Sequence, residues 1–169
     1  PSRIGRLPWR TLKTGPLVDG SGESLWYVLS PGFSSAPINH LSVGQLTVNG
    51  TANAAVALII APGSPTGAQQ RTEPSATNPP LAVDYLDLSN ASNGPFVTTG
   101  PASAFNDRVS VLSANELFAT INRVVLAEIR GLDDQAPNLP VRGLRRHFLD
   151  NGEFPWAALS SSGSAVPNK

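Results

Sequence analysis

The stretch 106–131 (NDRVSVLSANELFATINRVVLAEIRG) restricts the possible folds more than any other part of the chain. It opens with a turn signal at Asn106-Asp107 and continues as an alternating run at 108–112, which predicts a β-strand. A helix is predicted directly afterwards, because apolar residues then recur at helical spacing. A strand that leads straight into an amphipathic helix indicates an α+β domain. The residues on the apolar side of this helix are Leu117, Ile121, Val124, Val125 and Ile129.

The two ends of this helix carry their own signals. Ser113 and Glu116 have the S-x-x-E spacing of a capping box, in which each side chain satisfies the other residue's free backbone N–H group. Gly131 is placed to end the helix as a C-cap. We therefore predict one long helix, at about 114–130, that packs its apolar stripe on one face of a sheet.

Three further segments are predicted to be strands. The segment 24–30 (SLWYVLS) is aromatic and branched, and it stops at Pro31-Gly32. The segment 45–49 runs into Asn49-Gly50, a strong hairpin signal because both residues tolerate positive φ. The segment 54–61 (AAVALIIA) is continuously apolar, as expected of a strand buried on both faces. With 108–112, these segments give an antiparallel sheet of about four strands.

The rest of the chain is predicted to be rich in loops. Residues 63–80 contain much Pro, Gly, Ser and Thr, which indicates a long surface loop. A second helix is predicted near 140–150, within VRGLRRHFLDNG. The length suits a single globular domain at 1–159, followed by a flexible Ser/Gly-rich tail at 160–169.

The composition argues against several classes of function. Lys and Arg together number 12, as do Asp and Glu, so the formal net charge is zero. A neutral chain argues against a nucleic-acid partner or an anionic membrane surface. There is no Cys, which excludes disulfides and thiolate metal sites. We find no cofactor-binding motif, and we predict no cofactor.

The turn Asp19-Gly20-Ser21-Gly22-Glu23 has two interpretations. Asp19, Ser21 and Glu23 carry side-chain oxygens at alternating positions and form a calcium candidate, although a complete calcium loop has more acidic positions over about 12 residues. The alternative is a tight turn in which Asp19 caps backbone N–H groups and starts the strand at 24–30. A phosphate cradle is not indicated, because no Lys-Ser/Thr pair follows the glycines. We favour the tight turn.

Catalytic signals are few. His40 and His147 are the only histidines, and the sequence lacks the G-x-S-x-G motif of a nucleophile elbow. A triad needs a histidine beside both a nucleophile and an orienting acid, and nothing in the sequence predicts that arrangement. We therefore predict that the chain is not an enzyme. A small hydrolase that uses His40 or His147 is the least favoured alternative.

Aromatic and basic side chains give two candidate contact surfaces. Trp9, Trp26 and Trp156 could stack on a sugar, but two of them follow Pro at chain corners, so packing within the fold is the favoured interpretation. A basic cluster lies at 142–146 (RGLRR). On a neutral chain such a cluster is typical of a solvated helix face or a subunit contact.

The segment 19–32 (DGSGESLWYVLSPG) resembles a motif, D-x-W-G-x-P-[aromatic/Leu]-x-Y-x-x-S-P-G, of globular domains in type IV pilin-like proteins, notably the major pseudopilins of type II secretion. Ser21 stands where Trp is usual, and Ser24 stands where Pro is usual. The segments 5–20, 56–63 (VALIIAPG) and 105–118 (FNDRVSVLSANELF) are similar to blocks of a subgroup of prepilin-like bacterial proteins. The matching motif residues are Asp19, Gly22, Leu25, Tyr27, Ser30, Pro31 and Gly32.

A second passage, 144–158 (LRRHFLDNGEFPWAA), is similar to the region of pilins where the long helix ends and the globular head begins. The resemblance implies a structural subunit of a pilin-like or pseudopilin-like assembly, in the bacterial envelope or in an extracellular filament. Such a subunit self-associates or binds related subunits, and its surface could carry glycans. Calcium, which some pseudopilins bind, is not implied, because no matching C-terminal ligand loop is found.

The resemblance also implies an apolar N-terminal helix that anchors in the membrane and forms the filament core. The sequence holds no run of the ~18 apolar residues that a membrane helix needs. Membrane attachment is therefore expected only through a segment outside this sequence. The alternative to a structural subunit is an extracellular module that binds a glycan or a protein.

Overall fold

The computed structural model describes residues 4–34, 37–67, 69–71, 74–75, 78–131 and 143–155. They belong to two compact units, unit 1 (Pro1–Phe118) and unit 2 (Ala119–Lys169). Trp156, Arg142 and the predicted tail at 160–169 lie outside the described residues. In the part of the chain that is described, no helix is both long enough and apolar enough to span a bilayer.

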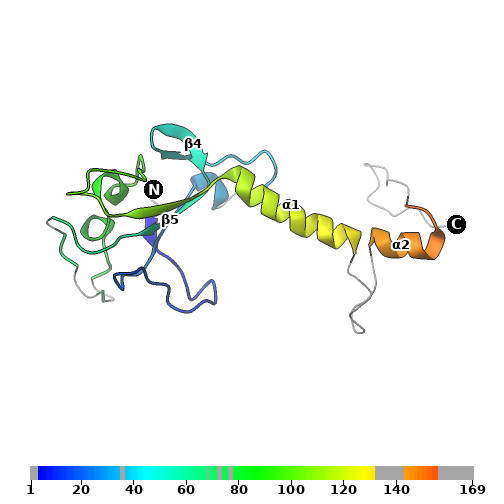
Figure 1. The fold of residues 1–169 in the computed structure, drawn as a ribbon, viewed down its shortest axis with the longest axis horizontal. Helices are drawn as coiled ribbons and strands as arrows, with labels where there is room; N and C mark the ends of the chain where they lie inside the picture. The colour runs from blue at the N-terminus through cyan, green and yellow to red at the C-terminus, as the bar shows by residue number, and fades with distance from the viewer. Residues whose placement is uncertain are drawn as a thin grey trace. The chain divides into compact units, whose positions relative to one another are not determined.

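Unit 1 is built on a four-stranded antiparallel sheet with the strand order β1-β2-β5-β6 (Figure 1). The register places Tyr27 opposite Ile59, and Leu58 opposite Val111. Together with two helices, this sheet confirms the predicted α+β class. The strands are β1 (Ile4–Arg6), β2 (Trp26–Leu29), β5 (Ala57–Ala61) and β6 (Arg108–Leu112).

The predicted hairpin forms a separate small sheet. β3 (Leu46–Val48) and β4 (Thr51–Ala55) pair antiparallel across Asn49 and Gly50, whose φ angles are 49° and 78°. Two positive φ values are typical of the tight turn that Asn-Gly favours. The prediction that 45–49 belongs to the main sheet is wrong. Its place there is taken by β1, whose three residues are too short a run to show alternation.

Val56 explains why the apolar run at 54–61 forms two strands. Its N–H donates to the carbonyl of Leu112 at 2.8 Å, and its own carbonyl accepts from the N–H of Ser30 at 2.8 Å. The chain therefore leaves the β3–β4 hairpin at Val56 and enters the main sheet as β5. Burial on both faces, which the run predicted, is seen in β5, where Leu58 lies in one hydrophobic cluster and Ala57 in another.

Alternation along β2 divides the core of unit 1 between the two faces of the main sheet. Trp26 and Val28 lie in the larger hydrophobic cluster, whereas Tyr27 and Leu29 pack against the smaller one. The larger cluster also contains Leu46, Val48, Ala55, Leu58, Ile60, Tyr85, Leu86 and Phe96, and the smaller one is formed by Phe33, Val56 and Ala57.

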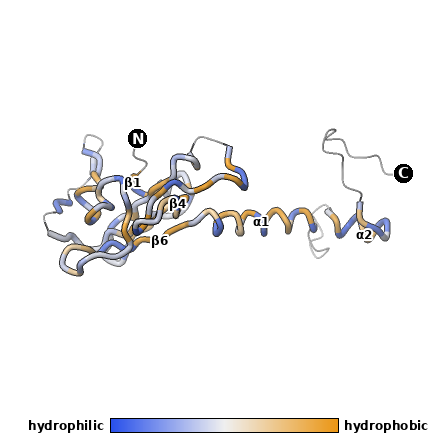
Figure 2. Tube along the Cα trace, turned by 90° about the horizontal axis from the view of Figure 1, so that it is seen from above, coloured by the Kyte–Doolittle hydropathy of each residue, from blue (hydrophilic) through white to orange (hydrophobic). Residues whose placement is uncertain are grey.

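Both predicted helices are present. Helix α1 (Ala114–Arg130) follows β6 after Ser113, and α2 (Leu144–Asn151) lies in unit 2 (Figure 1). Gly131 ends α1 with a φ of 91° and an N–H bond to the carbonyl of Ala127, as expected of a glycine that ends a helix. Hydrophobic and hydrophilic residues alternate along α1 at helical spacing (Figure 2).

The start of α1 packs against the smaller cluster of unit 1, as predicted. Leu117 and Phe118 contact the smaller cluster, together with Ala114. The helix from Ala119 onward belongs to unit 2. The exposed side chains that follow are Ile121, Val124, Val125, Leu126 and Ile129.

Candidate functional site

Asp19 closes the turn at the start of the motif. Its Oδ1 accepts hydrogen bonds from the N–H and the hydroxyl of Ser21, at 2.9 and 2.7 Å, and from the N–H of Glu23 at 3.0 Å. Its Oδ2 accepts from the N–H of Gly63 at 2.8 Å, which ties the turn to the end of β5. Burial raises the pKa of Asp19, but these hydrogen bonds outweigh it, and the pKa lies below its ordinary value. Asp19 thus caps backbone N–H groups, as the tight-turn interpretation predicts.

The other two residues of the calcium candidate also have protein partners. The Ser21 hydroxyl donates to Asp19, and Glu23 forms an ion pair of 3.3 Å with Arg71. Arg71 is nearly buried and also donates to the backbone carbonyls of Gly63 and Tyr85. Within the described ranges, no group of three or more His, Cys, Asp or Glu side chains is arranged to hold a metal ion. The geometry at Asp19 is that of a turn fastened to neighbouring segments.

Replacing Asp19 with alanine is expected to lower the free energy of unfolding by about 2 kcal/mol at pH 7, because its hydrogen bonds lose their acceptor. The loss should shrink at pH 3. The pKa of Asp19 is lower in the folded chain than its ordinary value of 3.8. Its carboxylate therefore stabilises the fold at a pH above 3.8, and this stabilisation is lost as the pH falls through the pKa of the folded state. Urea unfolding at both pH values measures the effect. Ser21→Ala removes only the hydroxyl donor and keeps the backbone N–H, so it should cost less; equal losses would contradict the capping role.

The middle of the motif also serves the fold. Gly22 has a φ of 87°, a conformation that favours glycine over any residue with a Cβ. Leu25 donates its N–H to the carbonyl of Leu17 and accepts at its own carbonyl from Leu7. Tyr27 packs against the smaller cluster, and burial raises the pKa of its phenol.

The end of the motif, Ser30-Pro31-Gly32, forms a corner that fastens β2 to the segment before β3. Ser30 is fully buried, and its hydroxyl accepts a hydrogen bond from the N–H of Gln45 at 2.9 Å. The N–H of Gly32 donates to the side-chain carbonyl of Gln45 at 3.1 Å. Pro31 begins a short 3-10 helix, η1 (Pro31–Phe33), at a position where a helix does not need its N–H.

Ser113 and Glu116 form the predicted capping box at the start of α1. Glu116 Oε2 accepts hydrogen bonds from the N–H and the hydroxyl of Ser113, both at 2.8 Å. Ser113 Oγ in turn accepts from the N–H of Glu116 at 3.2 Å. The hydrogen bonds from Ser113 lower the pKa of Glu116. The pair therefore fixes the first turn of α1 to the end of β6.

A buried polar cluster in unit 1 was not predicted from the sequence. Asp87, Asn90 and Asp107 are each at most 3% exposed. Asp107 Oδ2 accepts from the N–H of Asp87 at 3.0 Å and from the side-chain amide of Asn90 at 2.9 Å. Asp107 Oδ1 has no hydrogen-bond partner among the described residues. Burial raises the pKa of Asp107 to about 6, and the charge of Asp87 acts in the same direction, against the hydrogen bonds and Arg71.

Asp87 has a partner at both carboxylate oxygens. Its Oδ1 accepts from the hydroxyl of Thr66 and from the side-chain amide of Gln69, and its Oδ2 accepts from the N–H of Asn106 at 2.7 Å. It lies between two short 3-10 helices, η2 (Ala82–Asp84) and η3 (Leu88–Ala91). The signal in the sequence was an acid within the apolar run YLDL at 85–88, since a buried acid requires polar partners.

The structure describes two of the three tryptophans that were candidate contact residues, Trp9 and Trp26. Trp26 is 2% exposed and packs against Tyr85 with ring centroids 5.6 Å apart. Trp26 thus faces the larger cluster from β2, which agrees with the favoured interpretation of packing within the fold and contradicts the alternative of an exposed contact. Trp9 is partly exposed, and the guanidinium of Arg10 lies 5.0 Å from the centre of its ring. Trp156 lies outside the described residues.

The two histidines lie in different units. His40 is exposed in a loop of unit 1, and His147 lies on α2, where its Nδ1 is 2.9 Å from the carbonyl of Glu153. In the described ranges, neither histidine has a carboxylate at ion-pair distance. The orienting acid that a triad requires is thus not found beside either of them in these ranges.

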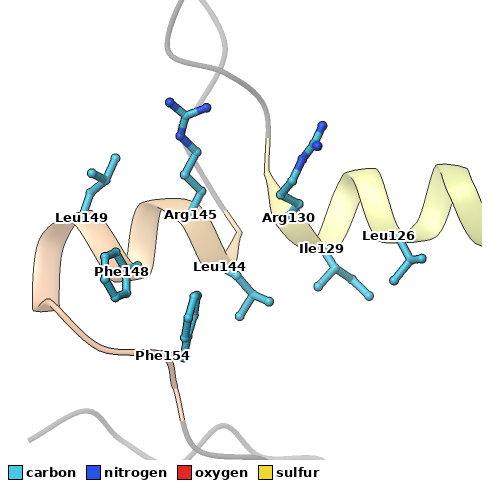
Figure 3. Close-up of a pocket in the computed structure, with 8 residues that line it drawn as sticks. All are labelled: Leu126, Ile129, Arg130, Leu144, Arg145, Phe148, Leu149 and Phe154. Atoms are coloured by element: carbon cyan, nitrogen blue, oxygen red, sulfur yellow. The ribbon is translucent and has the colours of Figure 1, made fainter.

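Unit 2 carries a large exposed apolar surface, which we call the apolar face. Part of it lines a cavity of about 620 Å³, where Phe148 and Phe154 pack with ring centroids 5.1 Å apart. Figure 3 shows Leu126, Ile129 and Leu144 directed to the same side of the two helices, and Phe154, from the segment after α2, lies on that side with its ring toward Leu144. The face consists of Ile121, Val124, Val125, Leu126 and Ile129 on α1, Leu144, Phe148 and Leu149 on α2, and Phe154.

Two glycines allow α2 to begin directly against the end of α1. Gly143 has a φ of 90°, and a Cβ at this position would lie 2.7 Å from both Gly131 N and Ile129 O. Any residue other than glycine would force the helices apart here. Because of this close approach, apolar side chains at the end of α1 and the start of α2, such as Ile129 and Leu144, lie next to one another (Figure 3).

Comparison of the chain with models of protein families, with curated proteins and with solved structures gave no match. The functional conclusion therefore depends on the residues of the chain and their geometry.

Proposed function

We propose that this chain is a structural subunit of a pilin-like or pseudopilin-like assembly. The observation that carries the proposal is the apolar face of unit 2, because soluble monomers rarely leave so many large apolar side chains together in water. Helix α1 starts on a fixed cap at Ser113 and Glu116 and then presents its apolar stripe to solvent. A rigid helix with an open apolar side suits contact with another subunit better than it suits catalysis.

The resemblance at 19–32 supports the same proposal. The motif residues fasten a turn, a strand and a corner of unit 1, so they serve as scaffold. We propose the bacterial envelope or an extracellular filament as the location, with further copies or related subunits as partners. Membrane attachment would reside in a segment outside this sequence.

A glycan-binding module remains the second proposal, and Trp9 is the residue that favours it. Trp9 is the partly exposed tryptophan of the described residues, and aromatic rings commonly stack on sugars. The guanidinium of Arg10, 5.0 Å from the ring centre, occupies one side of it, which leaves less of the ring for a ligand.

Electron microscopy of material from the native source, with an antibody to this chain, tests the structural proposal. We expect the label on filaments or on envelope assemblies that contain further copies or related subunits. Material from cells that lack the gene is the control for non-specific labelling. A chain recovered from native extracts as a monomer, together with specific binding to a glycan array that Trp9→Ala abolishes, would overturn the proposal in favour of the binding module.

A further inference from the structure

The size of the apolar face sets what can cover it. Its nine side chains are between 37% and 66% exposed. Side chains of this size, half exposed, amount to on the order of 800 Å², which is the area that each partner buries in a stable interface of standard size. A small ligand would cover only a fraction of the face, so a partner with a protein-sized apolar surface is required.

The pattern on α1 fits a second copy of the same helix. Ile121, Val125 and Ile129 are spaced by four residues and form one ridge on the helix surface. Two such ridges interdigitate when the helices cross at about −50°. All three residues are β-branched, so they lose little side-chain freedom on packing. A two-fold axis would pass near Val125, the middle residue of the ridge, and bring Ile121 of one copy close to Ile129 of the other.

The charges near the face do not favour an anionic lipid surface. Figure 3 shows the guanidinium groups of Arg130 and Arg145 directed away from Leu126, Ile129 and Leu144. A helix that binds an anionic membrane carries its basic groups where they reach the headgroups beside the buried apolar side. The apolar face can instead pack against another apolar face while both arginines stay in water.

We propose that the apolar face of unit 2 pairs with the same face of a second copy of this chain, across a two-fold axis near Val125. The inference rests on the proposed structural function and names the partner of one surface. Closed two-fold dimers are the commonest soluble assemblies, and they require a surface that is complementary to itself. The β-branched ridge, with Val124 on one side of it and Leu126 on the other, supplies such a surface, and Asn122 and Glu128 flank the ridge.

Substitutions on α1 of the full chain test the pairing. Val125→Glu places a charge at the proposed axis, whereas Ala127→Glu places it two residues away on the opposite side of the helix. Both positions are exposed, so neither change should unfold the protein. We expect a dimer in sedimentation equilibrium for the wild type and for Ala127→Glu, and at least about tenfold weaker association for Val125→Glu. A monomeric wild type at about 100 µM, or equal association of both variants, would overturn the pairing.

Cysteine cross-linking tests the symmetry. The chain contains no Cys, so a single introduced cysteine can react only with its copy in another molecule. Val125→Cys should form disulfide-linked dimers under mild oxidation at least about tenfold faster than Ala127→Cys, because only the former lies near the axis. Equal rates would overturn the two-fold arrangement.

The outcomes separate this inference from the proposed function. Labelled native filaments with a chain that stays monomeric in solution would leave the structural role standing and overturn the pairing. Binding of that monomeric chain to phosphatidylglycerol vesicles, lost in Val125→Glu, would assign the apolar face to lipid and likewise overturn it. A dimer that depends on Val125, in a source that shows no assemblies, would support the pairing and overturn the structural role.

Discussion

Asp87→Asn should destabilise unit 1 by about 3 kcal/mol, because both oxygens of this buried carboxylate accept hydrogen bonds and an amide keeps only one acceptor. If the amide nitrogen replaces Oδ1, it faces the donors of Thr66 and Gln69; if it replaces Oδ2, it faces the N–H of Asn106. The free energy of unfolding of Asp107→Asn should stay within about 1 kcal/mol of the wild type at pH 8. The amide oxygen can take the place of Oδ2 and accept both of its hydrogen bonds, and the substitution removes a buried charge whose Oδ1 has no hydrogen-bond partner among the described residues.

The pH dependence of these variants should differ as well. The pKa of Asp107 is about 6 in the folded chain against an ordinary value of 3.8, so the folded state binds the proton more tightly than the unfolded one. The contribution of Asp107 to stability is therefore fully present below pH 3.8 and is lost as the pH rises through about 6. An asparagine at this position does not ionise, so the variant does not lose stability in this way as the pH rises. The free energy of unfolding of Asp107→Asn should therefore depend less on pH between 4 and 7 than that of the wild type.

Urea unfolding of the wild type and both variants, at pH 5 and pH 8, measures these differences. Asp84→Asn is a matched control in the neighbouring η2 helix, and it should change the free energy of unfolding by less than about 0.5 kcal/mol. Equal destabilisation by Asp87→Asn and Asp107→Asn at pH 8 would show that the two acids are not distinguished by their hydrogen bonds.

Gly44→Ala is the second substitution with a large expected effect, a loss of about 3 kcal/mol or more. A Cβ at residue 44 would lie 2.2 Å from the carbonyl oxygen of Ala55 and 2.7 Å from the N of Val56. Both contacts are with backbone, which cannot rotate away as a side chain can. The methyl group would therefore separate the segment before β3 from the end of β4, and disturb Val56 where it joins the main sheet.

Thermal unfolding of Gly44→Ala, followed by circular dichroism, measures this effect. Gly15→Ala is the control, since a Cβ at Gly15 would have no neighbour within 4 Å and its φ is not in the left-handed region. We expect Gly15→Ala to unfold within a few degrees of the wild type. A Gly44→Ala variant as stable as Gly15→Ala would mean that β3 and β4 can shift without cost.

Short-range signals in the sequence predicted the local elements well. The capping box at Ser113 and Glu116, the turn at Asn49-Gly50 and the glycine after Arg130 each depend on a few neighbouring residues, and each has the predicted form. The sheet order was harder to predict, because pairing of β1 with β2 joins segments whose own patterns are weak.

The polar cluster and the apolar face could not be predicted for a different reason. Asp87 and Asp107 meet through hydrogen bonds between segments twenty residues apart, and no local pattern records such a meeting. The helical periodicity of α1 predicted an apolar stripe, but periodicity says nothing about how far along the helix its partner extends. The structure identifies Ala114, Leu117 and Phe118 as the residues of α1 that pack against the smaller cluster.

The hydrogen bonds of Val56 have a consequence for how unit 1 opens. The N–H of Val56 bonds to Leu112 and its carbonyl bonds to Ser30, so both groups pair with segments of the main sheet, although Val56 directly follows the small hairpin. Fluctuations that detach the hairpin must therefore also break a rung of the larger ladder. The two sheets should behave as one cooperative folding unit, and amide hydrogens at Ser30 and Val56 should exchange with solvent only when the whole unit opens.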